Sequence, residues 1–340
     1  MNRRAIVMIV ALLVAAFAVF MLSATQGTSG MSAHKALRVL WASASGQPAA
    51  PDIAPQDITI VRDIRLPRLL LGMLVGACLA VAGVVMQAFF QNPMAAPSII
   101  GVSAGGALGA TAALMLGFDF WLWRLSSVTV SAFVGALAVT ALVYLLSRRG
   151  GRTPVGVLLL TGIAVGAMAS AASSFILITY GQGQMDRVVY WLMGSLANGD
   201  WAKVQMIWPF ALLGCALVYL YGRDLNVLLL GDEQAHYLGL NVEQVKLVLL
   251  TLSSLLAAAA VAVSGVIGFV GLIIPHVTRL IVGPDHRWLL PTAGLAGAVL
   301  LTLADLGARL GGEIPIGVIT SMLGGPFFLY LLHKRREYEM

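Results

Sequence analysis

Three residues that could do chemistry lie inside one long apolar stretch. Residues 265–287 read GVIGFVGLIIPHVTRLIVGPDHR, and Pro275, His276 and Arg279 fall within its apolar part. A proline removes one backbone donor from a helix, and an ionisable side chain is costly in hydrocarbon unless it faces protein or water. We therefore expect this stretch to enter a bilayer as more than a passive anchor.

Two carboxylates further along the chain, Asp305 and Glu313, raise the alternative of an acid–base relay with His276. Such a relay predicts a proton-coupled carrier, because intramembrane ionisable residues often mark ion pathways. The order of the apolar runs places His276 near one membrane face and Glu313 at the other. We therefore favour pairing at helix ends and contact between subunits. No metal site is expected, because the five histidines are scattered.

Motifs for catalysis give no support for an enzyme. The phosphate-binding pattern GxxxxGK followed by Ser or Thr is absent, since no glycine precedes a lysine, and the zinc motif HExxH is absent too. Cys78 and Cys215 each stand alone in an apolar run and are interpreted as small buried hydrophobes. We expect no cofactor, and any ATP that drives this protein is hydrolysed by another chain.

The composition is that of a membrane protein. Of 340 residues, 59% are hydrophobic and 11% are charged, whereas a soluble domain holds about a quarter charged residues. The net charge of +6 does not indicate nucleic acid, because the basic residues sit in small groups between apolar runs. Basic loops of this kind set membrane orientation.

Ten apolar runs are close to the ~20 residues that a helix needs to cross a bilayer. They cover residues 5–23, 66–90, 99–116, 125–146, 155–180, 204–221, 246–263, 266–282, 289–308 and 316–332. An even number places both termini on one side. The basic clusters RRGGR and KRR both fall on the side of the termini, so we expect cytoplasmic termini.

Two connections are long. Residues 25–61 form an outer loop with an amphipathic helical pattern in its middle, and residues 222–244 form the sizeable inner loop. The inner loop mixes Asp232 and Glu233 with apolar Leu228, Leu229 and Leu238. This mixture predicts two short amphipathic helices that dock on a partner.

Five blocks of sequence, in order, resemble one family. They are RLPR (65–68), QNPMAAPSIIGVSAGG (91–106), YWLMGSLANGDW (190–201), GFVGLIIPHVTR (268–279) and ADLGARLGGEIPIGVITSMLGGPFFLYLL (304–332). They resemble the permease subunits of ABC importers that take up iron chelates, haem and cobalamin. The resemblance covers nearly the whole chain and implies one all-α transmembrane domain over residues 1–340, like the cobalamin-importer permease of type II ABC importers.

The resemblance also implies roles for particular residues. The inner loop would couple to an ATP-binding subunit through Gly231, Asp232, Glu233, Ala235, Leu238 and Gly239. A cationic outer rim of Arg65, Arg68 and Arg309 would dock a substrate-binding protein. The translocation path and its gate would include Met94, Val155 and Gly156. The family works as a homodimer with two ATPase subunits and one outer binding protein, which is periplasmic or extracellular.

The sequence thus predicts a permease of the cell inner membrane that moves an iron chelate by alternating access. A siderophore is the favoured cargo, and haem and cobalamin stay open. The rival is a secondary transporter driven by protons or sodium, which would bring polar groups together at mid-membrane on broken helices. A structural membrane scaffold would leave the Gly-, Ala- and Ser-rich run at residues 161–175 without a use.

Overall fold

The computed structural model describes residues 3–26, 31–45, 53–122, 124–181 and 183–336. Within them the only sheet is a short hairpin, β1 (Trp121–Leu122) and β2 (Leu125–Ser126). The helices in chain order are α1 (Arg3–Thr25), α2 (Ala33–Ser45), α3 (Pro55–Thr59), η1 (Ile60–Arg65), α4 (Leu66–Phe89), η2 (Pro97–Ile100), α5 (Val102–Met115), α6 (Ser127–Ser147), α7 (Val155–Tyr180), α8 (Met185–Leu192), α9 (Trp201–Pro209), η3 (Phe210–Gly214), α10 (Cys215–Leu220), α11 (Gly222–Leu228), α12 (Asp232–Tyr237), α13 (Val242–Ser264), α14 (Val270–Val282), α15 (His286–Leu310) and α16 (Ile316–Arg336).

Each of the ten expected spans coincides with helical structure. Seven segments are long and apolar enough to cross a membrane: Arg3–Thr25, Pro55–Phe89, Ser127–Ser147, Val155–Tyr180, Trp201–Leu220, Val242–Ser264 and His286–Leu310. Three shorter apolar helices, Val102–Met115, Val270–Val282 and Ile316–Tyr330, occupy the other positions. The all-α, multi-span fold class is therefore confirmed, and the helices α5 and α14 are shorter than the runs expected for them.

The connection at residues 25–61, which the sequence predicts as an outer loop, contains helices in its described residues. Its described residues form α2, which the amphipathic pattern predicts, and α3, which continues through η1 into α4. On the inner face of α2, Ala36 and Val39 pack with Ile53 and Val61 in a small apolar cluster. This cluster holds the connection against the start of α4.

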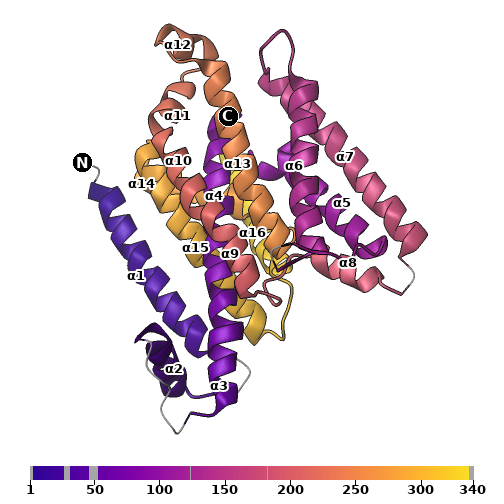
Figure 1. The fold of residues 1–340 in the computed structure, drawn as a ribbon. Coiled ribbons are helices and arrows are strands. Elements are labelled where there is room, and N and C mark those ends of the chain that lie inside the picture. Colours follow the sequence, from indigo (N-terminus) through magenta and orange to yellow (C-terminus); the bar gives the residue numbers. More distant parts are fainter. Residues whose placement is uncertain (1–2, 27–30, 46–52, 123, 182, 337–340) are drawn as a thin grey trace.

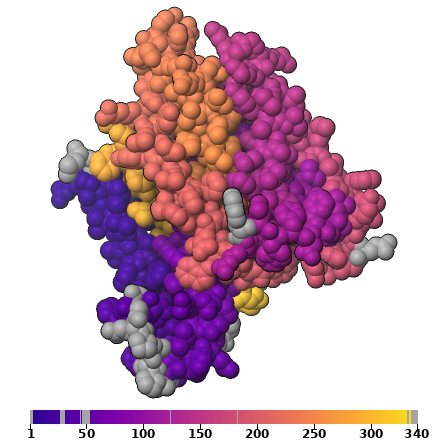
Figure 2. Space-filling model, in the orientation of Figure 1, coloured from indigo at the N-terminus to yellow at the C-terminus, as the bar shows by residue number. Residues whose placement is uncertain are grey.

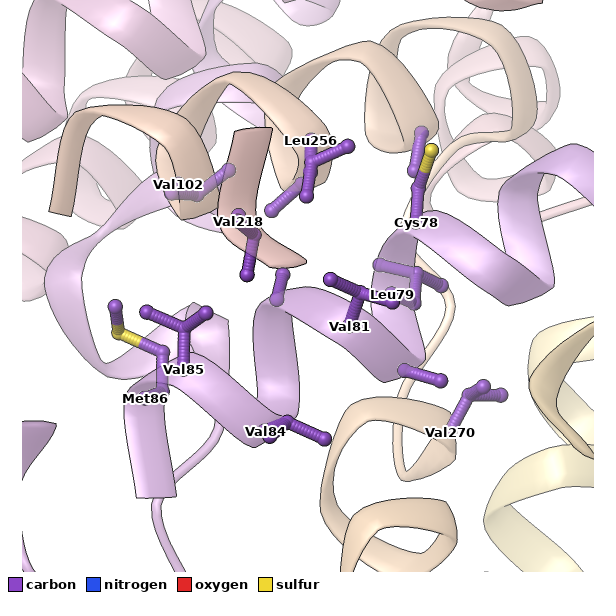
Figure 3. Packing of buried hydrophobic residues seen from close by; sticks show 14 of the residues in the cluster. Cys78, Leu79, Val81, Val84, Val85, Met86, Val102, Val218, Leu256 and Val270 are labelled. Carbon is purple, nitrogen blue, oxygen red and sulfur yellow. The ribbon is translucent and has the colours of Figure 1, made fainter. Parts of the chain in front are cut away.

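Helix α4 is the centre of the fold. It packs against α13, α14 and α15. Of the 18 most apolar consecutive residues in the segment Pro55–Phe89, 78% are buried. Figure 3 shows the close packing of its side chains, among them Cys78, Val81 and Val85, with Leu256 of α13 and Val270 of α14. Helices α5, α6 and α7 instead pack against one another, and α5 and α6 join this centre through α13.

Glycine pairs set how closely α4 approaches its neighbours. A Cβ added at Gly83 would lie 1.9 Å from the carbonyl oxygen of Gly271 in α14, and one at Gly76 would lie 2.2 Å from that of Gly297 in α15. Small residues let membrane helices bring their backbones together, because apolar lipid gives little other drive for helix association. A larger side chain at either position would push the helices apart.

The stretch around residues 265–269 departs from the expected span. Helix α13 ends at Ser264, Gly265 has φ +71°, and α14 begins only at Val270. Phe269 precedes α14 with φ +66°, a conformation that costs a bulky residue about 1–3 kcal/mol. A Cβ at Gly265 would lie 2.2 Å from the carbonyl oxygen of Trp191, so the break is fixed by close packing against α8.

The two ends of the molecule have different elements. Figure 1 places α12 and the turn between α6 and α7 at one end, and α2, α3 and α8 at the other. Figure 2 shows α12 and the α6–α7 turn as two projections. Both labelled chain ends lie towards the α12 end, which agrees with the even number of spans.

Candidate functional site

The connection between α10 and α13 contains two short helices, α11 and α12, as the sequence predicts. Helix α12 lies between Gly231 and Gly239, whose φ angles of +101° and +86° suit glycine. Ala235 is fully buried, whereas Tyr237 and Leu238 are 80% and 65% exposed. A short helix with one small buried residue and a free apolar face is suited to bind another molecule.

Helix α12 is fixed to the central helices by a charge. The carboxylate of Asp232 forms an ion pair with Lys246 of α13, whose side chain is only 3% exposed. The ammonium group of Lys246 also lies 5.7 Å from the centre of the Phe89 ring at the end of α4. Glu233, in contrast, is exposed and stays available to a partner.

Helix α11 is fixed by polar contacts that the sequence does not reveal. The amide of Asn226 donates to the carboxylate of Asp285 at 2.7 Å and accepts the backbone N–H of His286 at 2.9 Å. Gln91, just after α4, donates to the carbonyl oxygen of Leu228 at 2.9 Å. Helices α11 and α12 are therefore bound to α4, α13 and α15 by polar contacts.

Asp285 caps the N-terminus of α15 within this contact. Burial opposes the charged form of its carboxyl group, but hydrogen bonds from Asn226 and from the backbone and side chain of Arg287 outweigh burial. The pKa of Asp285 is therefore lowered. The charged cap joins α15 to α11 in the α10–α13 connection.

The expected cationic rim is a buried cluster instead. Arg65, Arg68 and Arg309 are each about 6% exposed, at 5%, 6% and 6%. We call these three residues, with Asp305 and Glu313, the arginine cluster. Its guanidinium groups bind other groups of the same chain. The prediction that these arginines form an exposed rim is therefore wrong. Whether these residues contact a binding protein stays a prediction.

Arg68 lies at the centre of the arginine cluster. Its Nε lies 2.9 Å from Oδ1 of Asp305, and its Nη2 lies 2.9 Å from Oε2 of Glu313. Nε of Arg309 lies 3.2 Å from the other oxygen of Asp305, as an ion pair without hydrogen-bond geometry. The two carboxylates are thus neutralised by arginines, which confirms pairing at helix ends for Asp305 and Glu313.

The arginine cluster also closes the end of α1. Arg65 donates to the carbonyl oxygens of Ala24 and Thr25 at 3.0 and 3.1 Å, and Arg309 donates to that of Ser23 at 3.1 Å. The last carbonyl groups of a helix lack partners within the helix, so these contacts satisfy them. The cluster thereby joins α1, α4 and α15 at one point.

The expected path residues lie at the α12 end. Val155 and Gly156 begin α7, and Met94 follows the end of α4; Val155 and Met94 are half-buried. A Cβ at Gly156 would meet no atom within 4 Å, so Gly156 faces open space. A groove of about 430 Å³ runs beside α5 and α7, which pack against each other, and small residues such as Ser103, Gly166 and Ser170 line it.

The histidines, cysteines and carboxylates of the described part of the chain do not gather into a metal site. No group of three His, Cys, Asp or Glu residues there could hold a metal ion. Residues 101–105 read GVSAG and match the spacing of a serine-hydrolase elbow. Ser103 lies inside α5 after a 3-10 turn rather than between a strand and a helix, so this match is not an elbow.

The fold and these surfaces define a helical membrane transport permease. Residues 8–334 match the FecCD transport family, and the chain belongs to that family. It is 46% identical over 277 residues to the cobalamin import system permease protein BtuC of Halobacterium salinarum, covering 81% of this chain and 74% of that protein. It is 44% identical over 279 residues to the hemin transport system permease protein HmuU of Yersinia pestis, covering 81% and 83%.

A solved structure supports the same class. The fold resembles a metal-chelate type ABC transporter in an inward-facing conformation, with a TM-score of 0.82 and 32% sequence identity. The match covers 96% of this chain and 98% of that one. The expectation of an ABC importer permease from the iron-chelate, haem and cobalamin group is therefore confirmed.

Proposed function

We propose that this chain is the permease subunit of an importer that is driven by ATP and supplied by a substrate-binding protein. Two copies form a homodimer in the inner membrane, with both termini in the cytoplasm and one ATP-binding subunit on each copy. A binding protein delivers a metal chelate to the outer face. The chelate then crosses by alternating access along the interface between the two copies.

The observation that carries the proposal is the exposed face of α12. Tyr237 and Leu238 are large apolar residues at an end of the bundle, where an unpartnered apolar surface marks an interaction site. The sequence has no nucleotide-binding loop of its own, so an ATPase on another chain is the fitting partner. In this role Gly231 and Gly239 bound the helix, Asp232 and Ala235 hold it in place, and Glu233 and Leu238 meet the ATPase.

The homodimer is supported by α7. Of its 18 most apolar consecutive residues only 22% are buried, and Ile163, Met168 and Phe175 are each more than half exposed. The groove beside α5 and α7 is lined by small residues, which leave room for a bulky cargo. We propose that Val155, Gly156 and Met94 form the inner gate of this path.

The cargo is proposed as an iron chelate, with a siderophore as the first choice. Haem and cobalamin are the alternatives, because the two relatives named for them are almost equally similar to this chain. The permease itself needs no tight substrate site, since affinity can reside in the binding protein. The assay below therefore compares all three kinds of cargo.

Uptake into reconstituted vesicles tests the proposal. We expect accumulation of a ferric siderophore, haemin or cobalamin only when ATP, the ATPase and the binding protein are present, and no need for an ion gradient. Accumulation by the permease alone under an imposed pH or sodium gradient would overturn it in favour of a secondary transporter. His276→Gln separates the two mechanisms further: glutamine cannot titrate, so a proton carrier that used His276 would lose coupling, whereas an ATP-driven permease keeps most of its rate.

A further inference from the structure

A cavity of about 550 Å³ opens between α8 and the ends of four other helices. Leu114 lies at the end of α5, Val128 near the start of α6, Lys203 near the start of α9 and Ser264 at the end of α13, and all four line it. Helices α6 and α13, and α9 continued through α10, are long and apolar enough to cross a membrane. Their ends mark the level at which hydrocarbon gives way to lipid head groups.

The lining of the cavity is divided by chemistry. Leu114, Val128, Ala262 and Val263 form its apolar part, and Ala262 and Val263 are almost fully buried. Its charged part comes from another set of residues, namely Asp186 and Arg187 of α8 and Lys203 of α9. A molecule that fills this cavity therefore needs an apolar portion beside a portion with charges.

The two cations have unused donors. The ammonium group of Lys203 donates to the carbonyl oxygen of Asn198 at 2.8 Å, the one hydrogen bond recorded for this group in the described residues. The side chain of Arg187 is exposed, and its guanidinium group has no ion pair or hydrogen bond to the described residues. Phosphate oxygens accept well from ammonium and guanidinium groups together. The carboxylate of Asp186 in the same wall would pair with an amine.

We propose that this cavity binds the head group of a zwitterionic phospholipid that carries a primary amine. The phosphate lies against Lys203 and Arg187, and the ammonium group lies against Asp186. The start of an acyl chain covers Val128, Ala262 and Val263. Trp191 and Tyr190 also line the cavity, and such rings are enriched at the level of lipid head groups. The bound lipid would brace α8 against α9 and α13, independently of which cargo is transported.

Lipid retention by the purified full-length permease tests the inference. The protein is incubated with equimolar phosphatidylethanolamine and phosphatidylglycerol, washed in detergent and measured by native mass spectrometry. We expect Lys203→Gln and Arg187→Gln each to lower retained phosphatidylethanolamine about tenfold, as loss of one charge-assisted contact implies. Arg62→Gln is the matched control, because Arg62 is exposed near the same end of the molecule but does not line the cavity.

The amine is tested separately. Asp186→Asn should lower retention of phosphatidylethanolamine and spare or raise that of phosphatidylglycerol, which has no ammonium group. If retention in Arg187→Gln equals that in Arg62→Gln, no head group binds here and the inference is wrong. Displacement of the lipid by water-soluble O-phosphoethanolamine at equal concentration would also overturn it, because the acyl chain would then contribute nothing. Arg187 is exposed, so this variant should stay folded even if Lys203→Gln does not.

Discussion

The two ends of the molecule use charged side chains in opposite ways. At the α12 end, Glu233 is exposed beside Tyr237 and Leu238, and it has no recorded partner within the described residues. At the other end, the arginines and Asp305 of the arginine cluster are buried and bound to one another or to the carbonyl groups of α1. A free charge next to an exposed apolar residue suits a surface that meets a partner, whereas paired buried charges hold helices together.

This difference changes how the family pattern is read in this chain. Both ends contain charged residues at positions that the resemblance assigns to partners, but only the α12 end offers them to a partner in the monomer. At the other end, docking of a binding protein would require its carboxylates to compete with Asp305, with Glu313 and with the end of α1. Glu313, at 46% exposed, is the most accessible member of the arginine cluster.

The largest effect is expected from breaking the arginine cluster. Arg68→Ala removes the cation that binds both Asp305 and Glu313, and loss of one partner from a buried ion pair costs about 3–5 kcal/mol. We expect a strong fall in the melting temperature of the purified protein and in its yield from membranes. Arg62→Ala, six residues earlier and exposed, is the control. Equal melting temperatures of the two variants would show that the buried charges do not hold α1, α4 and α15 together.

A smaller effect, confined to binding, is expected at the α12 end. Leu238→Ala and Glu233→Arg should leave the melting temperature unchanged, because both side chains are exposed. Each should weaken retention of the ATP-binding subunit in a pull-down, by about 2 kcal/mol if Leu238 is a central contact. Leu220→Ala serves as control, since this leucine is 73% exposed on a span. If both variants retain the ATPase at the wild-type level, α12 is not the surface that binds it.

The smallest effect is expected from Asp285, the residue that caps the N-terminus of α15 and binds Asn226 of α11. Asp285→Asn keeps a side chain that can cap α15 but removes the charge, so we expect a loss of stability of about 0.5 kcal/mol, as for partly exposed pairs. The pKa of Asp285 is lowered in the folded protein, so its contribution is present above the ordinary pKa of 3.8 and is lost as pH falls through the folded pKa. The melting difference between wild type and Asp285→Asn should therefore vanish in the most acidic buffers. A difference that persists there would have to come from something other than the charge.

Much of the fold could be predicted from the sequence, because hydrophobic runs of a set length dictate helices in a bilayer. All ten runs are helical, and the mixture of leucines and carboxylates in residues 222–244 predicted two short helices with a free apolar face. These features are local. They depend on residues within about one helix length, which the sequence lays out directly.

The break before α14 could not be placed from the sequence. Residues 266–282 read as one apolar run, but Gly265 and Phe269 take positive φ angles and α14 starts late. The cause is contact with Trp191 and the loop after α8, more than seventy residues earlier in the chain. The polar contacts of Asn226 and Gln91 were missed for the same reason, since an amide gives no sign of its partner.

What the sequence by itself determined is a helical membrane permease, together with two short helices in the connection between α10 and α13. Only the tertiary structure decided which cations are free. Arg62, Arg65 and Arg68 recur every third residue and read alike, yet Arg62 is exposed while Arg65 and Arg68 are buried. The π-helical turn η1 over Ile60–Arg65 alters the helical phase at this point, and the carboxylates that hold Arg68 lie 237 and 245 residues away. Whether a charged side chain faces solvent or an ion partner depends on what the fold brings beside it.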